Sequence, residues 1–202
     1  MTISGSQFAK LMIEKEFIKE QDILGLTDNT APPLTDANTI LTKFGGKIYK
    51  TQSEIKGTVV YTLGYHGKYI PLEEPRAVVK FYKDIANKLI TKIKDYAEEY
   101  SESTLKRTNL ECKLNEHDCL RDYKGSATNA EILLKDWIKL GYFELKAGYI
   151  YLGPTSKYNL TTFLQPFMKT CCISGEKLIY YKYCCGTYYH PMTECSSCSQ
   201  IE

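Results

Sequence analysis

The C-terminal segment of the chain is crowded with potential metal ligands. Six of the eight cysteines and one of the three histidines lie from Cys171 onward. Thiolate and imidazole are the ligands that tetrahedral zinc prefers, and a Cys-x-x-Cys pair lets two sulfurs reach one ion without backbone strain. The spacing therefore predicts a zinc site, which would stabilise a segment too short for a large core. The predicted ligands are Cys172, Cys184, Cys185, His190, Cys195 and Cys198.

Two other interpretations of this segment stay open at the level of sequence. The cysteines could be incidental thiols in a tyrosine-rich tail. A disulfide framework would need an oxidising compartment, and residues 1–10 contain no long apolar stretch that would direct the chain there. The adjacent cysteine pairs are geometrically ambiguous, so the sequence does not decide which of Cys171, Cys172 and Cys184 touches the metal.

Length and composition predict a globular protein. The 202 residues suit one large domain or two small ones with an appendage, and 43% hydrophobic residues suffice for packed cores. No apolar run approaches the length of a bilayer span, so we expect no membrane partner and a soluble, intracellular chain. A formal net charge of +2 is too small to mark a nucleic-acid-binding protein, so such a function would need local patches.

The first third of the chain changes from helical to alternating periodicity. Apolar residues at helical spacing predict a first helix from Gln7, with Ser6 as its cap and Phe17 at the end of its apolar stripe. Helices followed by a β-hairpin are the pattern of a winged-helix domain, which we assign to residues 1–72. The other predicted elements here are helices 19–26 and 36–44 and strands 47–51 and 58–63.

The same succession of elements is predicted a second time. A long amphipathic helix leads into a shorter helix that carries Trp137 on its inward face, then a hairpin, then a final helix that ends near Pro166. We therefore expect a second winged-helix domain at residues 73–168 and a small zinc module at residues 169–202. The predicted elements are helices 76–100 and 129–140, strands 142–145 and 149–152, and a helix opening at Gly153-Pro154.

The first predicted hairpin and its flanks are rich in lysine. Between Ala37 and Leu72, Glu54 is the only acidic residue. Lysines on a wing often contact the phosphate backbone, whereas arginine, which reads base edges, is scarce in this chain. The pattern predicts non-specific DNA contact, and the alternative is a solvated wing whose lysines protect a strand edge. The predicted contacts are Lys43, Lys47, Lys50, Lys56 and Lys68.

The second half of the chain resembles a known family. The stretch Leu134-Lys-Asp-Trp-Ile-Lys-Leu-Gly-Tyr-Phe143, then Gly148-Tyr-Ile-Tyr-Leu-Gly153, then the Cys/His tail, is similar to non-SMC element one, the variant-RING subunit of the SMC five–six complex. The first half agrees more loosely. The resemblance implies tandem winged helices, a nuclear role in DNA repair, and a MAGE-like partner (non-SMC element three) among other SMC five–six subunits.

The chain departs from this family at its metal ligands. The family's RING holds two zinc ions with seven cysteines and one histidine, but Lys169 and Thr193 fall at two of the aligned positions. The site that they would serve keeps only Cys172 and His190. The resemblance therefore implies one zinc ion rather than two. Its remaining ligands are Cys185, Cys195 and Cys198, with Cys184 or His190 as the fourth.

These departures shape the expected function. A RING positions a ubiquitin-conjugating enzyme through an apolar contact, for which Ile173 is available, and a cation after the last ligand, which Ser199–Glu202 lacks. We therefore expect an α+β scaffold of tandem winged helices with a degenerate RING-like module, whose ubiquitin-ligase activity is weak or lost. A transcription-associated winged-helix and zinc protein that binds DNA, and an active RING-type ubiquitin ligase, are the alternatives. No nucleophile elbow or phosphate-binding glycine loop is present.

Overall fold

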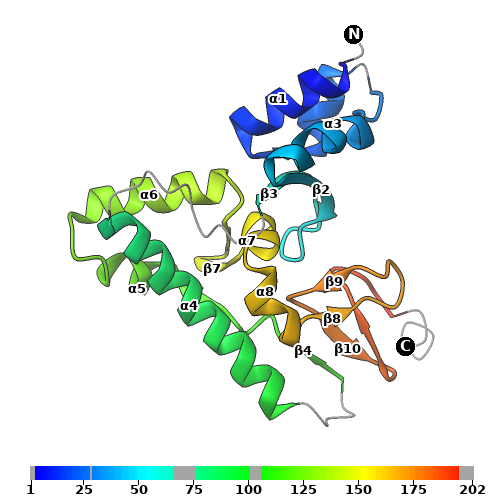
Figure 1. Ribbon diagram of the computed structural model, residues 1–202. Helices are drawn as coiled ribbons and strands as arrows, with labels where there is room; N and C mark the ends of the chain where they lie inside the picture. Colours follow the sequence, from blue (N-terminus) through cyan, green and yellow to red (C-terminus); the bar gives the residue numbers. More distant parts are fainter. Residues whose placement is uncertain (1–2, 28, 66–75, 101–105, 196–202) are drawn as a thin grey trace.

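The computed structural model describes residues 3–27, 29–65, 76–100 and 106–195. Helices and short antiparallel strands are mixed along the chain, which confirms the predicted α+β class. Three regions meet around the short helix α7 (Pro154–Asn159), which lies at the centre of Figure 1. Within the described residues, no helix combines the length and the apolar composition that a membrane span needs.

The N-terminal region is a three-stranded antiparallel sheet packed against three helices. Its elements are α1 (Gly5–Lys15), β1 (Phe17–Lys19), α2 (Glu20–Leu26), α3 (Leu34–Leu41), the 3-10 turn η1 (Thr42–Phe44), β2 (Gly46–Gln52) and β3 (Val59–Tyr65). The strand order is β1-β3-β2, so the last strand of the region lies in the middle of the sheet. Phe8, Met12, Ile48 and Tyr61 form part of the buried core between the sheet and the helices.

The first helix is shorter than the sequence predicted, and a strand follows it. Ser4, rather than Ser6, caps α1 in a capping box. The helix ends because Glu16 adopts a φ of 57°, and its carbonyl accepts a 2.7 Å hydrogen bond from the Leu63 amide of β3. Phe17 therefore belongs to β1 and not to the helix. A three-residue strand is too short to show a recognisable alternation in the sequence.

The second region repeats the order of elements of the first. Its elements are α4 (Arg76–Glu99), β5 (Leu114–Asn115), α5 (Glu116–Arg121), α6 (Ala127–Lys139), β6 (Phe143–Lys146) and β7 (Tyr149–Leu152). The strand order β5-β7-β6 again puts the last strand in the middle. Trp137 is 5% exposed, and both it and Phe143 pack against Tyr82 of α4, with ring centroids 5.6 and 5.2 Å away. The inward position predicted for Trp137 is confirmed.

Some large apolar side chains of the predicted helices are exposed in the structure. Phe44, Ile132 and Phe163 are 76%, 53% and 53% exposed. The 3-10 turn that ends α3 carries Phe44 outward. The predicted final helix is broken at Leu160, where the backbone leaves helical geometry (φ −101°, ψ 14°). It consists of α7, α8 (Thr161–Leu164) and the 3-10 turn η2 (Gln165–Phe167).

The C-terminal region is built from short hairpins that depend on distant parts of the chain. Its strands are β8 (Lys169–Thr170), β9 (Lys177–Leu178), β10 (Lys182–Cys184) and β11 (Thr187–Tyr189), and β4 (Arg107–Thr108) pairs with β10. The buried Asn109 side chain donates to the Ile179 carbonyl at 2.7 Å and accepts from the Tyr181 amide at 2.6 Å. Ile179 and Tyr180 enter the core of the second region. This region is therefore integrated with the segment that follows α4.

Candidate metal centre

Three cysteine side chains come together near the end of the described chain. The sulfurs of Cys184, Cys185 and Cys195 all lie within 4.8 Å of one another. The first two are 3.7 Å apart, well beyond the disulfide bond length of about 2.05 Å. Two sulfurs at about 2.3 Å from one tetrahedral zinc ion would be separated by about 3.8 Å, so the donors fit that geometry. The cluster can hold a metal ion. Cys198, a further predicted ligand, lies outside the described residues.

The turn that presents two of these sulfurs has an unusual backbone. Strands β10 and β11 are joined by Cys185 and Gly186, whose φ angles are 51° and 77°. Positive φ at both central residues is the mark of a type I′ hairpin turn, which favours Asn-Gly. A cysteine at such a position is strained, and strain of this kind is often maintained where a side chain has a function. The conformation turns Cys185 back toward its neighbour Cys184.

Two of the three thiols of the cluster are enclosed by the module. Cys184 and Cys195 are 2% and 3% exposed, whereas Cys185 is exposed. Cys195 Sγ makes a 3.4 Å hydrogen bond to the Tyr189 hydroxyl, and this bond is the main cause that raises the pKa of Tyr189 to about 12. Hydrogen bonds from neighbouring groups to ligand atoms orient metal ligands, so Tyr189 would hold Cys195 in place.

The structure keeps Cys172 and His190 outside this cluster. Cys172 is exposed, and among the described residues no third ligand atom joins it and His190. His190 is 4% exposed; its Nδ1 accepts from the Met192 amide at 3.3 Å, and its buried Nε2 has no hydrogen-bond partner among the described residues. Burial lowers the pKa of this imidazole. Lys169, at the position of a missing ligand, places its ammonium 5.4 Å from the ring centroid of Tyr188.

Cys171 differs sharply from its neighbour Cys172. It is 3% exposed, which by itself would raise its pKa, but several hydrogen bonds to the sulfur outweigh burial and lower the pKa of the thiol. The donors are the Ser174 hydroxyl and the backbone amides of Ser174, Ile173 and His190. This loop therefore stabilises a negative charge on the Cys171 sulfur, even though Cys171 lies outside the three-cysteine cluster.

Cys112 and Cys119, which the sequence left without an assigned role, are buried in the second region. Burial raises the pKa of the Cys112 thiol to about 12 and that of Cys119 to about 11. Thiols held neutral in an apolar core are poor nucleophiles and poor metal ligands. Both cysteines therefore serve as core residues of the second region.

The lysines predicted to contact DNA do not share one face of the hairpin. Lys47 and Lys50 are exposed and three residues apart on β2, so the alternation of the strand points them to opposite sides. Lys50 pairs with Glu20 at 2.7 Å. Lys43 is exposed beyond α3, Lys56 is exposed at the tip of the hairpin, and Lys68 lies outside the described residues.

Comparison with known proteins supports a relation at the level of fold. No family model matches the sequence, and no curated protein matches it. The structure is similar to a chain in the solved structure of an "Nse1-Nse3-Nse4 complex", with a TM-score of 0.60. The fold is that of a chain in this complex. The match covers 94% of the present chain and 88% of the other at 13% sequence identity, so it concerns the fold alone.

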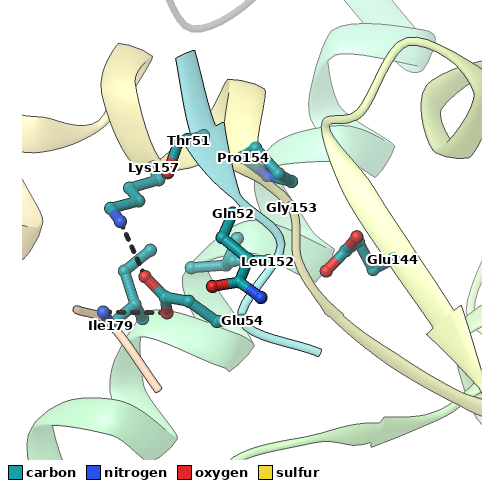
Figure 2. A pocket seen from close by; sticks show the side chains of 9 residues that line it. All are labelled: Thr51, Gln52, Glu54, Glu144, Leu152, Gly153, Pro154, Lys157 and Ile179. Atoms are coloured by element: carbon teal, nitrogen blue, oxygen red, sulfur yellow. Dashed lines mark hydrogen bonds and ion pairs between the residues drawn. The ribbon is translucent and has the colours of Figure 1, made fainter. Parts of the chain in front are cut away.

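A buried carboxylate holds the C-terminal region against the rest of this Nse-like fold. Glu54, at the tip of the first hairpin, is 6% exposed, and its Oε1 lies 2.7 Å from Lys157 Nζ of α7. Its Oε2 accepts from the backbone amide of Ile179 at 3.0 Å, and Figure 2 shows this contact beside the one to Lys157. The same oxygen also accepts from the Tyr180 amide at 2.6 Å. Lys157 Nζ also pairs with Glu176 at 3.1 Å. We call this group the Glu54 junction; it joins all three regions of the chain.

Residues far apart in sequence build this junction, so periodicity and motif spacing could not reveal it. The sequence showed Glu54 only as the single acid of a lysine-rich stretch, and its partner Lys157 lies 103 residues later. Lys157 is 3% exposed, and the nearby carboxylate of Glu54 keeps its pKa raised although burial alone would lower it. The Lys157 ammonium therefore stays charged inside the protein, where its partners are fixed.

Glu144 of β6 is a second buried acid beside the same hairpin tip, and Figure 2 shows it apart from the Glu54 pair. The Ser53 hydroxyl lies 2.7 and 2.9 Å from its two oxygens. Burial raises the pKa of this carboxyl, and the hydrogen bond from Ser53 and the charge of Lys56 only partly oppose that change.

The raised pKa of Glu144 predicts a specific dependence of stability on pH. The folded chain binds this proton more tightly than the unfolded chain, so the contribution of Glu144 to the free energy of unfolding falls as pH rises from about 4.5 through the folded pKa. A Glu144→Gln variant lacks this titration. Urea unfolding between about pH 4.5 and pH 7.5 should show the variant gaining stability relative to wild type as pH rises. Parallel profiles of the two proteins would contradict the assignment.

Proposed function

We propose that this chain is an Nse1-like subunit of an SMC5/6-type chromosome maintenance complex that acts in DNA repair in the nucleus. One observation carries the proposal: a fold match across 94% of the chain is combined with a thiol cluster at the C-terminal end, where the sequence resembles a variant RING. The matched chain belongs to a complex with Nse3 and Nse4, so the proposed partners are a MAGE-like Nse3 subunit and the other subunits of the complex.

The proposed architecture follows from the repeated order of elements. Both regions contain the same order of elements: helix, strand, helix, helix, strand, strand. In both sheets the last strand lies in the middle, and we propose that each region is a winged-helix domain. We place their limits at residues 1–72 and 73–168, followed by the module at residues 169–202. Integration of the module through β4 and the Glu54 junction favours a scaffold over a freely mobile appendage.

The module is proposed to hold one zinc ion and to have little ubiquitin-ligase activity. The thiol cluster offers one tetrahedral site, and Lys169 and Thr193 occupy positions where the family's other site needs ligands. Ile173, the proposed apolar contact for a ubiquitin-conjugating enzyme, is 67% exposed. When bound, zinc would fix the loops around Cys184, Cys185 and Cys195 rather than take part in a reaction.

The test of the proposed function is assembly with a defined partner. Co-expression of the full chain with the MAGE-type subunit of its own organism should yield a one-to-one complex in size-exclusion chromatography with light scattering. The free chain run alone is the control for self-association. Separate elution of the two proteins at micromolar concentration would refute the proposed pairing.

Contact with DNA through the first hairpin is proposed as a secondary property of the same subunit. Lys43 and Lys47 are exposed, which leaves them available to phosphates. In titrations with duplex DNA at increasing salt, a Lys43→Glu/Lys47→Glu variant should bind more weakly than wild type and lose about two units of salt slope. Binding that is tight, sequence-specific and independent of the MAGE-like subunit would instead favour the transcription-associated alternative.

A further inference from the structure

An open groove lies between the N-terminal region and the end of α6. Its volume is about 510 Å³. Helix α1, strand β1 and helix α2 line one side, and α6, the residues after it and the tip of the first hairpin line the other. Leu26, at the end of α2, is 56% exposed there. The apolar part of the lining consists of Leu11, Phe17, Ile18, Leu26 and Ile138.

The rim of this groove is positively charged. Lys15 of α1, Lys19 of β1 and Lys139 of α6 lie around it, together with Lys56 from the turn between β2 and β3. Within the part of the chain that the structure describes, none of these four ammonium groups forms an ion pair. The acids of the lining are Asp22, which is exposed, and Glu144, which is buried and bound to the Ser53 hydroxyl. The rim therefore carries four lysines and one exposed acidic residue.

This combination of charge and apolar surface restricts what can bind. A small anion would be expected to meet converging cations, whereas here the lysines are spread along the groove. Nucleic acid would need phosphate contacts and aromatic faces for stacking, but Phe17 is the one aromatic side chain among the described lining residues. A peptide with large apolar side chains flanked by several carboxylates satisfies both parts of the surface.

We propose that this groove is a docking site for an acidic, amphipathic peptide segment of a partner protein. Two or more apolar side chains of the segment pack against Leu26, Phe17 and Ile138, while its carboxylates pair with the lysines of the rim. We choose this occupant for its charge complementarity, since none of the four rim ammonium groups forms an ion pair within the described chain. The inference stands on the lining of the groove and does not depend on the proposed function.

The experiment uses a phage-displayed library of random 16-residue peptides, selected on the full chain. Enriched peptides are synthesised with a fluorophore, and their affinities are measured by anisotropy for wild type and for Lys15→Glu/Lys139→Glu. The matched control is Lys10→Glu/Lys135→Glu, which makes the same charge changes on α1 and α6 but outside the groove lining. Circular dichroism and thermal unfolding check that all variants remain folded.

We expect the selected peptides to be rich in Asp and Glu around two or more large apolar residues. Their affinity should fall tenfold or more in the groove variant, stay within twofold in the control, and weaken as salt is raised. A Leu26→Asp variant should also lose binding. Peptides without an acidic bias, equal losses in both charge variants, or a groove variant that loses duplex DNA binding while keeping peptide binding would each overturn the proposal.

Discussion

A Cys195→Ser variant is expected to purify without zinc, whereas the wild-type chain should carry one zinc ion. Cys195 is buried and lies within 4.8 Å of the two other thiols, so its loss removes a ligand that the loop cannot replace. Structural zinc contributes directly to folding free energy, so zinc affinity should fall by at least about 100-fold and the C-terminal module should lose its order. Elemental analysis of the purified proteins, with chelator competition for affinity, measures both effects.

Two further substitutions distinguish the loss of a metal ligand from a change in the backbone around it. Cys172→Ser changes an exposed thiol outside the cluster and is expected to keep full zinc content. Cys185→Asn supplies the residue that a type I′ turn prefers at a φ of 51°, yet it should also lose zinc. A Cys185→Asn protein with undiminished zinc would show that the strained cysteine is not a ligand. Two zinc ions in the wild-type chain would contradict the single site.

The sequence predicted the long periodic elements well and the short strands poorly. The helix at residues 76–100 and both hairpins occur where periodicity indicated, because amphipathic stripes of that length are strong local signals. Strands β1, β4 and β5 contain only two or three residues and exist through pairing with distant segments. Their residues, such as Phe17, carry no local signal of that pairing.

The candidate site was predictable to the extent that it is local in sequence. Cys184, Cys185 and Cys195 lie within a short stretch, and ligand spacing was enough to group them. Cys172 and His190 were predicted from the same stretch, but the structure places both outside the three-cysteine cluster. No local pattern indicates that a buried Glu54 connects this module to the first hairpin, since that contact depends on the folded arrangement of three regions.

Removal of the Glu54 carboxylate is expected to destabilise the whole chain. In Glu54→Ala the Lys157 ammonium keeps only Glu176 as a carboxylate partner, and the amides of Ile179 and Tyr180 lose their acceptor inside the protein. Breaking a buried ion pair on one side costs about 3–5 kcal/mol when the remaining charge has no other partner. Because Glu176 still pairs with Lys157, we expect a loss at the lower end of this range, about 3 kcal/mol. Urea unfolding measures this loss, and hydrogen exchange at the Tyr180 amide should accelerate as the module separates from α7.

A surface pair in the same chain provides the control for that prediction. Lys50 and Glu20 are also 2.7 Å apart, but their side chains are 46% and 26% exposed, against 4% and 6% for Lys157 and Glu54. Glu20→Ala should therefore cost only about 1 kcal/mol. In the double variant Glu54→Ala/Lys157→Ala the buried ammonium is gone, so its destabilisation should be smaller than the sum of the single changes by roughly 1–3 kcal/mol. If Glu54→Ala and Glu20→Ala lower the free energy of unfolding equally, burial does not strengthen the Glu54 junction. Strand β4, and a metal ion where the thiol cluster holds one, would then keep the module in its place in the fold.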